Sequence, residues 1–268
     1  MCPLCDSRDS CPSWLQGLAF QGWDWRYVQC RSCGSLYCEM MPDDEMLHKM
    51  YGKAYLAAFP SDHNIADPKE PERVVAWLES QPVGTFVDYG CGEGTLLIEA
   101  KRLGWDAIGI ELNSDVAERT QAATGARVMT PEAAIHAGIQ ADALHLGDVI
   151  EHLTRMNEQM PSIMRLLKLD GALLAQGPLE ANPHLFLKFV QVSRGLRRGR
   201  KTEMAPYHVL LATSEGQRRL FARFGLSEVE YHLSEVCWPA PANLRVGLWR
   251  QPKQVAMFTI RKLSQCIS

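Results

Sequence analysis

The chain has 268 residues, a formal net charge of −3 at pH 7, and 46% hydrophobic and 22% charged residues. This length allows one full α/β domain and one small module. A slightly acidic chain gives no reason to expect general nucleic-acid binding. No apolar run reaches the length that a bilayer crossing needs, so we expect no membrane contact.

Two CxxC pairs near the N-terminus have the spacing of a structural metal site. Cys2 and Cys5 form the first pair, Cys30 and Cys33 form the second, and 24 residues separate the pairs. Two residues between thiolates let both sulfurs reach one metal, and four sulfurs complete the tetrahedral shell of structural zinc. A module of this size cannot bury much core without a metal. We therefore predict a zinc (Zn²⁺) ribbon at residues 1–41.

Redox chemistry and disulfide bonds are the alternatives to zinc for these cysteines. A redox CxxC motif usually stands alone beside a thioredoxin-like βαβ pattern, which is absent here. Disulfides need an oxidising compartment, and no secretory hydrophobic region precedes Cys2, so we expect a cytoplasmic chain with reduced thiols. Cys11 and Cys38 lie near the two pairs, and either could replace one of the four ligands.

The segment 42–81 bridges the ribbon and the rest of the chain. We expect it to be mostly helical, with interruptions at Pro60, Pro68 and Pro71. Tyr51 and Tyr55 are four residues apart and therefore fall on one helical face. Their simplest role is to pack the ribbon against the core.

The segment 85–94 carries the strongest pattern in the chain, a strand followed by a glycine-rich turn. Residues 85–87 are apolar, β-branched or aromatic, which predicts a short buried strand. The residues that follow are Asp88-Tyr89-Gly90-Cys91-Gly92-Glu93-Gly94. The glycines let the backbone turn sharply and approach a ligand closely, where a Cβ would collide.

A helix and a second strand follow the glycine turn. Residues 95–101 predict a helix that ends at Gly104, and the N-terminus of this helix favours an anionic group in the turn. Glu111 closes the next apolar run at 108–110, 23 residues after Asp88. A carboxylate in that place can accept hydrogen bonds from both hydroxyls of a ribose. The pattern therefore predicts a ligand that contains a nucleoside.

The spacing of the glycines separates two kinds of nucleoside cofactor. A dinucleotide site would need a third glycine at position 95, where this chain has Thr95. The GxGxG turn, with an acid two residues before its first glycine, instead resembles motif I of the class I S-adenosylmethionine-dependent methyltransferases. The resemblance implies S-adenosylmethionine as cofactor. It places the following residues at the cofactor: Asp88, Tyr89, Gly90, Gly92, Glu111, Leu112 and Asp148.

The same resemblance implies the fold of residues 82–268. We expect a doubly wound α/β Rossmann-like sheet, mostly parallel with a terminal antiparallel strand, preceded by the small zinc ribbon. In methyltransferases that carry such an N-terminal module, the bridging segment often caps the cofactor pocket. A place in the active site is therefore the alternative for Tyr51 or Tyr55.

Downstream segments continue the resemblance to about residue 262. Residues 142–153 resemble the fourth strand and the following D-V-I-E-H-L element of the family, with Ala143 and His145 as departures. An apolar stripe predicts a helix at 161–169, and 168–178 resemble the strand element that follows it. A further helix is expected at 214–224. These matches are specific to the superfamily and not to a substrate.

Methyl transfer demands little of the side chains, because the sulfonium is already an activated donor. A base is needed only where the acceptor must lose a proton, and histidine titrates in the right range. His152 follows Glu151 at the carboxyl end of the fourth strand, where a pocket should open. A histidine bonded to the backbone at a helix start is the alternative. His208, beside Tyr207, is the second catalytic candidate, while His145 in its apolar run is expected in the core.

A basic stretch follows the fifth predicted strand, and its cations are Arg194, Arg197, Arg198, Arg200 and Lys201. In the resembling enzymes this region commonly lies over the substrate. Arginine suits phosphate and carboxylate, so the stretch would recognise an anionic acceptor. A solvated basic loop is the alternative.

We therefore expect an S-adenosylmethionine-dependent methyltransferase that acts on a small molecule, such as a sugar, a nucleotide-linked sugar or another metabolite. One alternative is RNA or protein methylation with the ribbon as recognition module, which would make nucleic acid a partner. The other is a non-catalytic protein that holds the cofactor without turnover. The intact Asp88, glycine turn and Glu111 argue against the second alternative.

Overall fold

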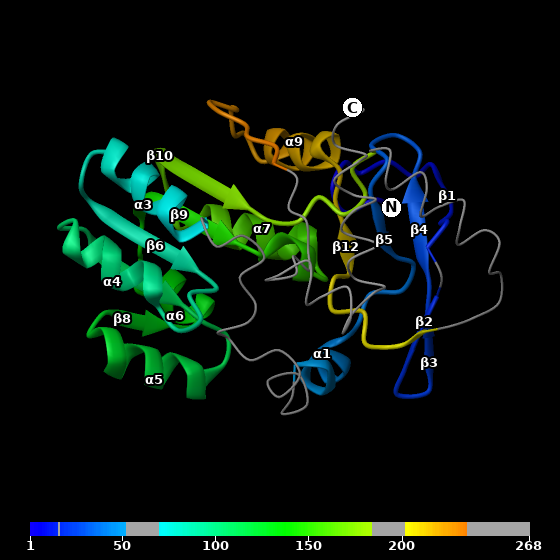
Figure 1. Ribbon diagram of the computed structural model, residues 1–268, viewed down its shortest axis with the longest axis horizontal. Helices are drawn as coiled ribbons and strands as arrows, with labels where there is room; N and C mark the ends of the chain where they lie inside the picture. The colour runs from blue at the N-terminus through cyan, green and yellow to red at the C-terminus, as the bar shows by residue number, and fades with distance from the viewer. Residues whose placement is uncertain (16, 52–69, 184–201, 235–268) are drawn as a thin grey trace, which may run out of the picture.

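A computed structural model describes residues 1–15, 17–51, 70–183 and 202–234 of the chain. Figure 1 shows two lobes, with a parallel sheet and its helices on one side and the N-terminal strands on the other. Tyr55 and the basic stretch at 194–201 lie outside the described residues. None of the helices in the described ranges has the length and apolar character needed to cross a membrane.

The first lobe contains a five-stranded sheet with the order β10-β9-β6-β7-β8. Its strands are β6 (Thr85–Tyr89), β7 (Asp106–Ile110), β8 (Arg127–Met129), β9 (Ala141–Gly147) and β10 (Leu167–Gln176). Every neighbouring pair is parallel, which confirms the predicted Rossmann-like sheet. No antiparallel strand joins it within the described residues. The chain passes outward from β6 to β8 and then returns to β9, so the order reverses beside β6. Such a reversal opens a crevice at the carboxyl ends of the strands.

Five helices of the described residues belong to this lobe, and side chains cap the starts of two of them. They are α3 (Glu70–Ser80), α4 (Thr95–Arg102), α5 (Ser114–Thr124), α6 (Pro131–His136) and α7 (Met156–Met164). The Asn113 side chain accepts two backbone N–H groups at the start of α5, and Thr130 caps α6. Helix α4 matches the helix predicted at 95–101, and Gly104 follows it with φ +90°.

The helix predicted at 161–169 is wrong at both ends. Helix α7 begins five residues earlier, tolerates Pro161 in its interior, and ends at Met164. Leu167 already pairs with Ala141 at the start of β10. The apolar stripe was ambiguous because a buried strand and a buried helix segment both need consecutive apolar residues. Here residues 167–169 form part of a strand because β10 pairs with β9.

The second lobe contains two small sheets. One has the order β1-β4-β5-β12 and the other β11-β2-β3. The strands are β1 (Ser10–Pro12), β2 (Leu18–Phe20), β3 (Trp23–Trp25), β4 (Tyr27–Cys30), β5 (Leu36–Cys38), β11 (Thr202–Glu203) and β12 (Leu210–Leu211). Strands from the C-terminal half therefore complete both N-terminal sheets.

Two helices join the lobes. Helix α1 (Asp44–Met50) begins at the cap Asp43, and α9 (Ser214–Arg223) begins at the cap Thr213. The Arg223 guanidinium donates to the carbonyl oxygens of Pro3 and Leu4, at 2.8 and 3.0 Å. Figure 1 shows α1 and β12 between the parallel sheet and the N-terminal strands. Buried residues of both lobes form one continuous core.

A close approach at Gly109 fixes the glycine turn against the sheet. A Cβ built on Gly109 would lie 2.6 Å from Cys91 Sγ and 2.9 Å from Leu97 Cδ1. Cys91 belongs to the turn and Leu97 to α4, so only glycine in the middle of β7 lets both pack there.

We predict that Gly109→Ala lowers the free energy of unfolding by about 1–3 kcal/mol, because the added methyl overfills this contact. Urea unfolding followed by circular dichroism measures the change. Adding Cys91→Ala removes the nearest clashing atom and should restore part of the loss. Equal stability of the wild type and Gly109→Ala would contradict the close approach.

Candidate functional site

The glycine turn lies at the carboxyl end of β6. Gly90, Gly92 and Gly94 have φ values of +81°, +49° and +76°, in the left-handed region that favours glycine. The backbone N–H groups of Gly90 and Cys91 donate to Ile110 O at 2.8 and 3.1 Å. The turn is therefore anchored to the end of β7 and leads directly into α4.

Glu111 follows β7 and is brought beside this turn by the same contacts. Its Oε1 accepts the backbone N–H of Asn113 at 2.9 Å, which orients the carboxylate at the end of the strand. Leu112, next in the chain, has 72% of its surface exposed. Tyr89, at the end of β6, is half-buried, and burial followed by the charge of Glu132 raises its pKa to about 12. The sequence prediction that these residues bind a cofactor stays a prediction.

Asp88 is held inside the sheet just before the turn. It is 4% exposed, and its Oδ1 lies 2.8 Å from Nδ1 of His145, which is 3% exposed. His145 Nε2 lies 3.1 Å from Gln176 Oε1. The row crosses β6, β9 and β10, so a buried polar line runs under the crevice. The expectation that His145 lies in the core is confirmed, but its contact with Asp88 was not foreseen.

A second group of polar side chains follows β9. Asp148 has φ +50°, which is rare for a residue other than glycine. The 3₁₀ helix η2 (Ile150–His152) comes next. Glu151 is 5% exposed, and its Oε1 has no hydrogen-bond partner among the described residues. Burial and then the charge of Asp148 raise the pKa of Glu151 to about 8, and burial also raises the pKa of Asp148.

His152 and His208 lie against each other beside Glu151, with ring centroids 5.1 Å apart. His152 Nδ1 lies 2.9 Å from Tyr207 O, and a carbonyl oxygen only accepts, so we assign the proton to Nδ1. Burial and then the charge of His208 lower the pKa of His152 to about 4. The ring is therefore neutral, with its lone pair on Nε2. The backbone contact proposed as the alternative for His152 is present, and it leaves one ring nitrogen available.

Glu180 orients His208 in a similar way. Its Oε2 lies 2.8 Å from His208 Nδ1. Burial lowers the pKa of His208, but the hydrogen bond and charge of Glu180, with Glu151 and Asp148, outweigh it and raise that pKa. Sequence reasoning missed Glu180, because no motif or spacing sets it apart.

Tyr51 connects the N-terminal lobe to His152 and Tyr207. It follows α1, and its hydroxyl lies 2.8 Å from His152 Nδ1 and donates to Tyr207 O at 3.0 Å. The ring also packs against the rings of both partners. Of the two roles considered for Tyr51, the structure therefore places it beside a candidate catalytic residue.

The four predicted metal-binding cysteines lie together in the N-terminal lobe. Their sulfurs all lie within 4.8 Å of one another. Cys2 Sγ is 3.8 Å from Cys33 Sγ, and Cys5 Sγ is 3.5 Å from Cys30 Sγ. Cys11 and Cys38, considered as replacements, do not belong to this cluster.

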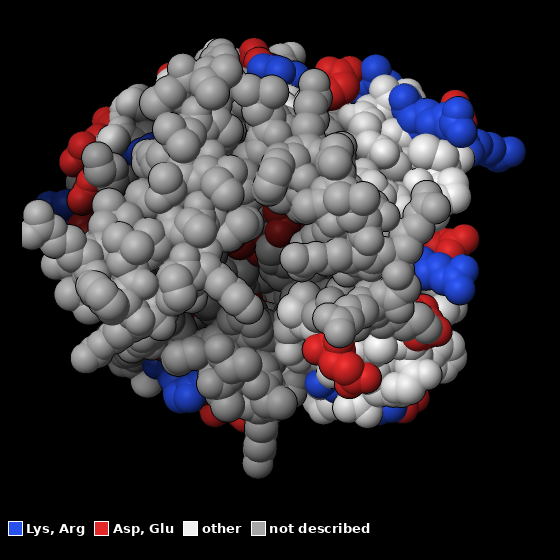
Figure 2. All heavy atoms as spheres, turned by 45° about the vertical axis from the view of Figure 1, so that its right-hand side comes forward, with Lys and Arg blue, Asp and Glu red and all other residues white. Residues whose placement is uncertain are grey.

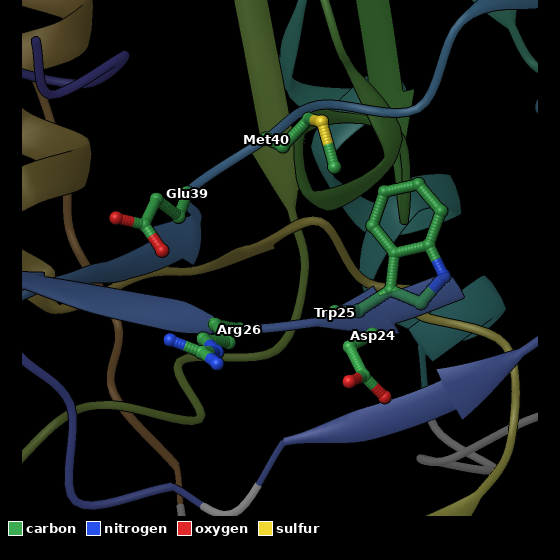
Figure 3. A pocket seen from close by; sticks show the side chains of 5 residues that line it. All are labelled: Asp24, Trp25, Arg26, Glu39 and Met40. Carbon is green, nitrogen blue, oxygen red and sulfur yellow. The ribbon is translucent and has the colours of Figure 1, made fainter.

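One surface hollow lies away from all these groups. Figure 3 shows its lining side chains, which are Asp24, Trp25, Arg26, Glu39 and Met40 of the N-terminal lobe. Its volume of about 190 Å³ is smaller than that of ordinary ligand pockets, which start near 300 Å³. In Figure 2, acidic side chains of the described residues are visible near the centre of the view.

Comparison with known proteins supports the sequence resemblance. The family described as Methyltransferase domain matches residues 62–231, more than half of the chain. No curated protein sequence matches the chain.

Two solved structures are similar in fold. The magnesium protoporphyrin IX methyltransferase of Synechocystis PCC 6803, with bound SAH, is 16% identical; the match covers 68% of this chain and 89% of that one, with a TM-score of 0.49. The plantazolicin methyltransferase in complex with SAH is 15% identical, with 78% and 85% covered and a TM-score of 0.49. Both scores are too low to support an argument about substrate.

The buried contact between Asp88 and His145 generates a test. We predict that His145→Ala lowers the free energy of unfolding by about 3–5 kcal/mol, because the Asp88 carboxylate stays buried without its partner. Chemical denaturation measures the loss.

The matched variant replaces both members, as Asp88→Val with His145→Leu. It should cost less than His145→Ala, because no unpaired charge remains. If the loss in free energy of unfolding of the double variant equals the sum of the losses of the two single variants, the two side chains do not interact.

Proposed function

The chain belongs to the methyltransferase domain family, and from this premise we propose that it transfers the methyl group of S-adenosylmethionine to a small-molecule acceptor. The observation that carries the proposal is the glycine turn anchored on Ile110 beside Glu111. The turn can admit the methionine part of the cofactor, because no Cβ projects from its three glycines. Glu111 can accept hydrogen bonds from the ribose hydroxyls.

The Asp88 carboxylate would act from beneath this turn. Its contact with His145 fixes one carboxylate oxygen inside the sheet. The negative charge then lies at the base of the turn, where the family resemblance places the ammonium end of the cofactor. In our proposal Tyr89, Leu112 and Asp148 also contact the cofactor, because they lie at or just after the ends of β6, β7 and β9.

The acceptor would lie over the second polar group. Glu151 is buried and His152 is half-buried at the carboxyl end of β9, next to the reversal of strand order. A buried site suits a small molecule better than a folded protein or a duplex. The carboxylates of Asp148 and Glu180 also make this end of the site unfavourable for a phosphate backbone.

His152 has a free ring nitrogen toward this site. Because Nδ1 is bonded to Tyr207 O, Nε2 can perform one of two tasks. It can accept a proton from the acceptor, or it can bind a metal ion that holds the acceptor. His208 is oriented by Glu180, which favours its protonated form, so it would have to lose that proton before it performed either task. Recognition of an anionic acceptor by Arg194–Lys201 stays an expectation from sequence.

Structural zinc in the N-terminal lobe forms a second part of our proposal. Tetrahedral zinc with bonds of about 2.3 Å places its sulfurs about 3.8 Å apart. The observed separations of 3.8 and 3.5 Å fit this geometry. The pKa of Cys33 is lowered to about 5 by hydrogen bonds from Cys2 and then Ser35, although burial opposes them, so a thiolate is favoured. The metal would fix the strands that carry α1 and Tyr51 to the site.

We predict that Glu111→Ala weakens S-adenosylmethionine binding by about 1.5–3 kcal/mol, because hydrogen bonds to a charged group are lost. Titration calorimetry with S-adenosylmethionine and its demethylated product measures the effect, and NAD should not bind. Glu111 is a cleaner target than Asp88, whose replacement also breaks a buried pair.

Glu99→Ala is the matched control for this test. Glu99 is an exposed carboxylate on α4 that pairs with Arg102, so it carries the same charge away from the turn. Equal affinity in Glu111→Ala and Glu99→Ala would refute the ribose assignment.

We predict about one zinc per chain by elemental analysis, with complete loss in Cys30→Ser, because structural sites need all four ligands. Limited proteolysis of that variant should cut within residues 1–41 first, while the parallel sheet stays protected. Cys11→Ser is the control and should keep its zinc. Loss of metal in Cys11→Ser or Cys38→Ser would show that the ligands are assigned wrongly.

A further inference from the structure

Glu151, His152 and His208 form a second cluster of possible metal ligands, separate from the four cysteines. One ligand atom from each lies within 4.8 Å of the other two. Glu151 and His152 belong to η2, and His208 comes from the segment before β12. The backbone N–H of Val209 donates to Glu151 O at 2.9 Å, so the two segments are fixed to each other.

Both histidines have Nδ1 engaged and Nε2 available. His152 Nδ1 bonds to Tyr207 O, and His208 Nδ1 bonds to the Glu180 carboxylate. Among the described residues, no hydrogen bond involves Nε2 of either ring. Metal-binding histidines almost always donate their other N–H to a carbonyl or a carboxylate, which fixes the tautomer and the ring. His152 has the bond to a carbonyl oxygen, and His208 has the bond to a carboxylate.

Glu151 supplies an independent observation. Its side chain is 5% exposed, and its Oε1 has no partner within the described ranges. A buried polar oxygen without a hydrogen bond is costly. No lysine or arginine of the described residues pairs with Glu151, Asp148 or Glu180 in this group. A bound cation would give Glu151 Oε1 the partner that it lacks among the described residues.

We propose that Glu151, His152 and His208 bind a divalent first-row transition metal through one carboxylate oxygen and the two Nε2 atoms. Two imidazoles and one carboxylate suit Mn²⁺, Fe²⁺, Co²⁺ or Zn²⁺ better than Mg²⁺ or Ca²⁺. Three ligands from the protein leave coordination positions open. If the proposed methyl transfer is correct, a metal held by these residues would lower the pKa of an acceptor hydroxyl in one of the open positions. The proton would pass to solvent water, and the oxygen would take the methyl group as its bond to the sulfonium sulfur breaks.

Glu180 and Tyr51 are positioning residues in this proposal. Glu180 fixes the ring of His208, and the Tyr51 hydroxyl packs beside His152 Nδ1. Loss of such a supporting group typically lowers metal affinity by about 10–100-fold. Glu180→Gln keeps the size of the side chain and removes its charge, so it should weaken binding without abolishing it.

The experiment uses the full chain and Mn²⁺, without S-adenosylmethionine or acceptor, so its result does not depend on methyl transfer. Electron paramagnetic resonance of free Mn²⁺ measures binding, and a hard ion of this kind avoids the four thiolates. We expect one Mn²⁺ per chain. Glu151→Gln and His208→Ala should each lose at least about 100-fold in affinity, and Glu180→Gln about 10-fold.

His232→Ala is the matched control, because His232 is an exposed histidine paired with Glu230. Circular dichroism checks that each variant is folded. The Co²⁺ absorption spectrum gives a second measurement. We expect the spectrum of Glu180→Gln to differ from that of the wild type, and this comparison can be made even if other variants fold poorly.

Absence of Mn²⁺ binding in the wild type, or unchanged binding in Glu151→Gln, would overturn the proposal. Bound Mn²⁺ in a protein that transfers no methyl group would instead contradict only the proposed function.

Discussion

Parallel pairing of β6 with β9 is the constraint on which both halves of the site depend. Asp88 lies opposite His145 in this pairing, so their side chains meet inside the sheet. The same register brings the end of β9, with Asp148 and η2, beside the glycine turn that follows β6. A cofactor held by the turn and an acceptor held at η2 would therefore lie next to each other, at the ends of two neighbouring strands. Neither half of the site could form from its own segment alone.

The N-terminal lobe contributes more than a separate metal module would. Its two sheets are completed by β11 and β12, and its cysteines lie next to α9 through Thr213, whose hydroxyl donates to Cys33 O at 2.6 Å. The segment between β11 and β12 also carries Tyr207 and His208. A change in the cysteine cluster would thus be felt at the histidines, because the same strands support both.

The site combines the buried carboxyl group of Glu151 with the exposed carboxyl groups of Asp148 and Glu180. Asp148, Glu151 and Glu180 surround two histidines that differ in the direction of their pKa shifts. His152 is desolvated against a carbonyl oxygen, whereas His208 is paired with a carboxylate. One ring is therefore kept neutral while its neighbour favours the charged form. A cation that binds here through both rings would displace the proton of His208.

The amino-acid sequence was sufficient to predict those features that depend only on neighbouring residues. The glycine turn, α4, the acid after β7 and the CxxC spacing were all read from sequence, because turns, helix periods and ligand spacings are set by neighbouring residues. The segment 161–169 failed since an apolar run fits either a helix or a buried strand, and the partner strand β9 made the choice. Only the tertiary structure could join Tyr51 to His152, Asp88 to His145 and Glu180 to His208. These contacts cross long stretches of chain, and their partners are selected by strand order and packing, which no local spacing encodes.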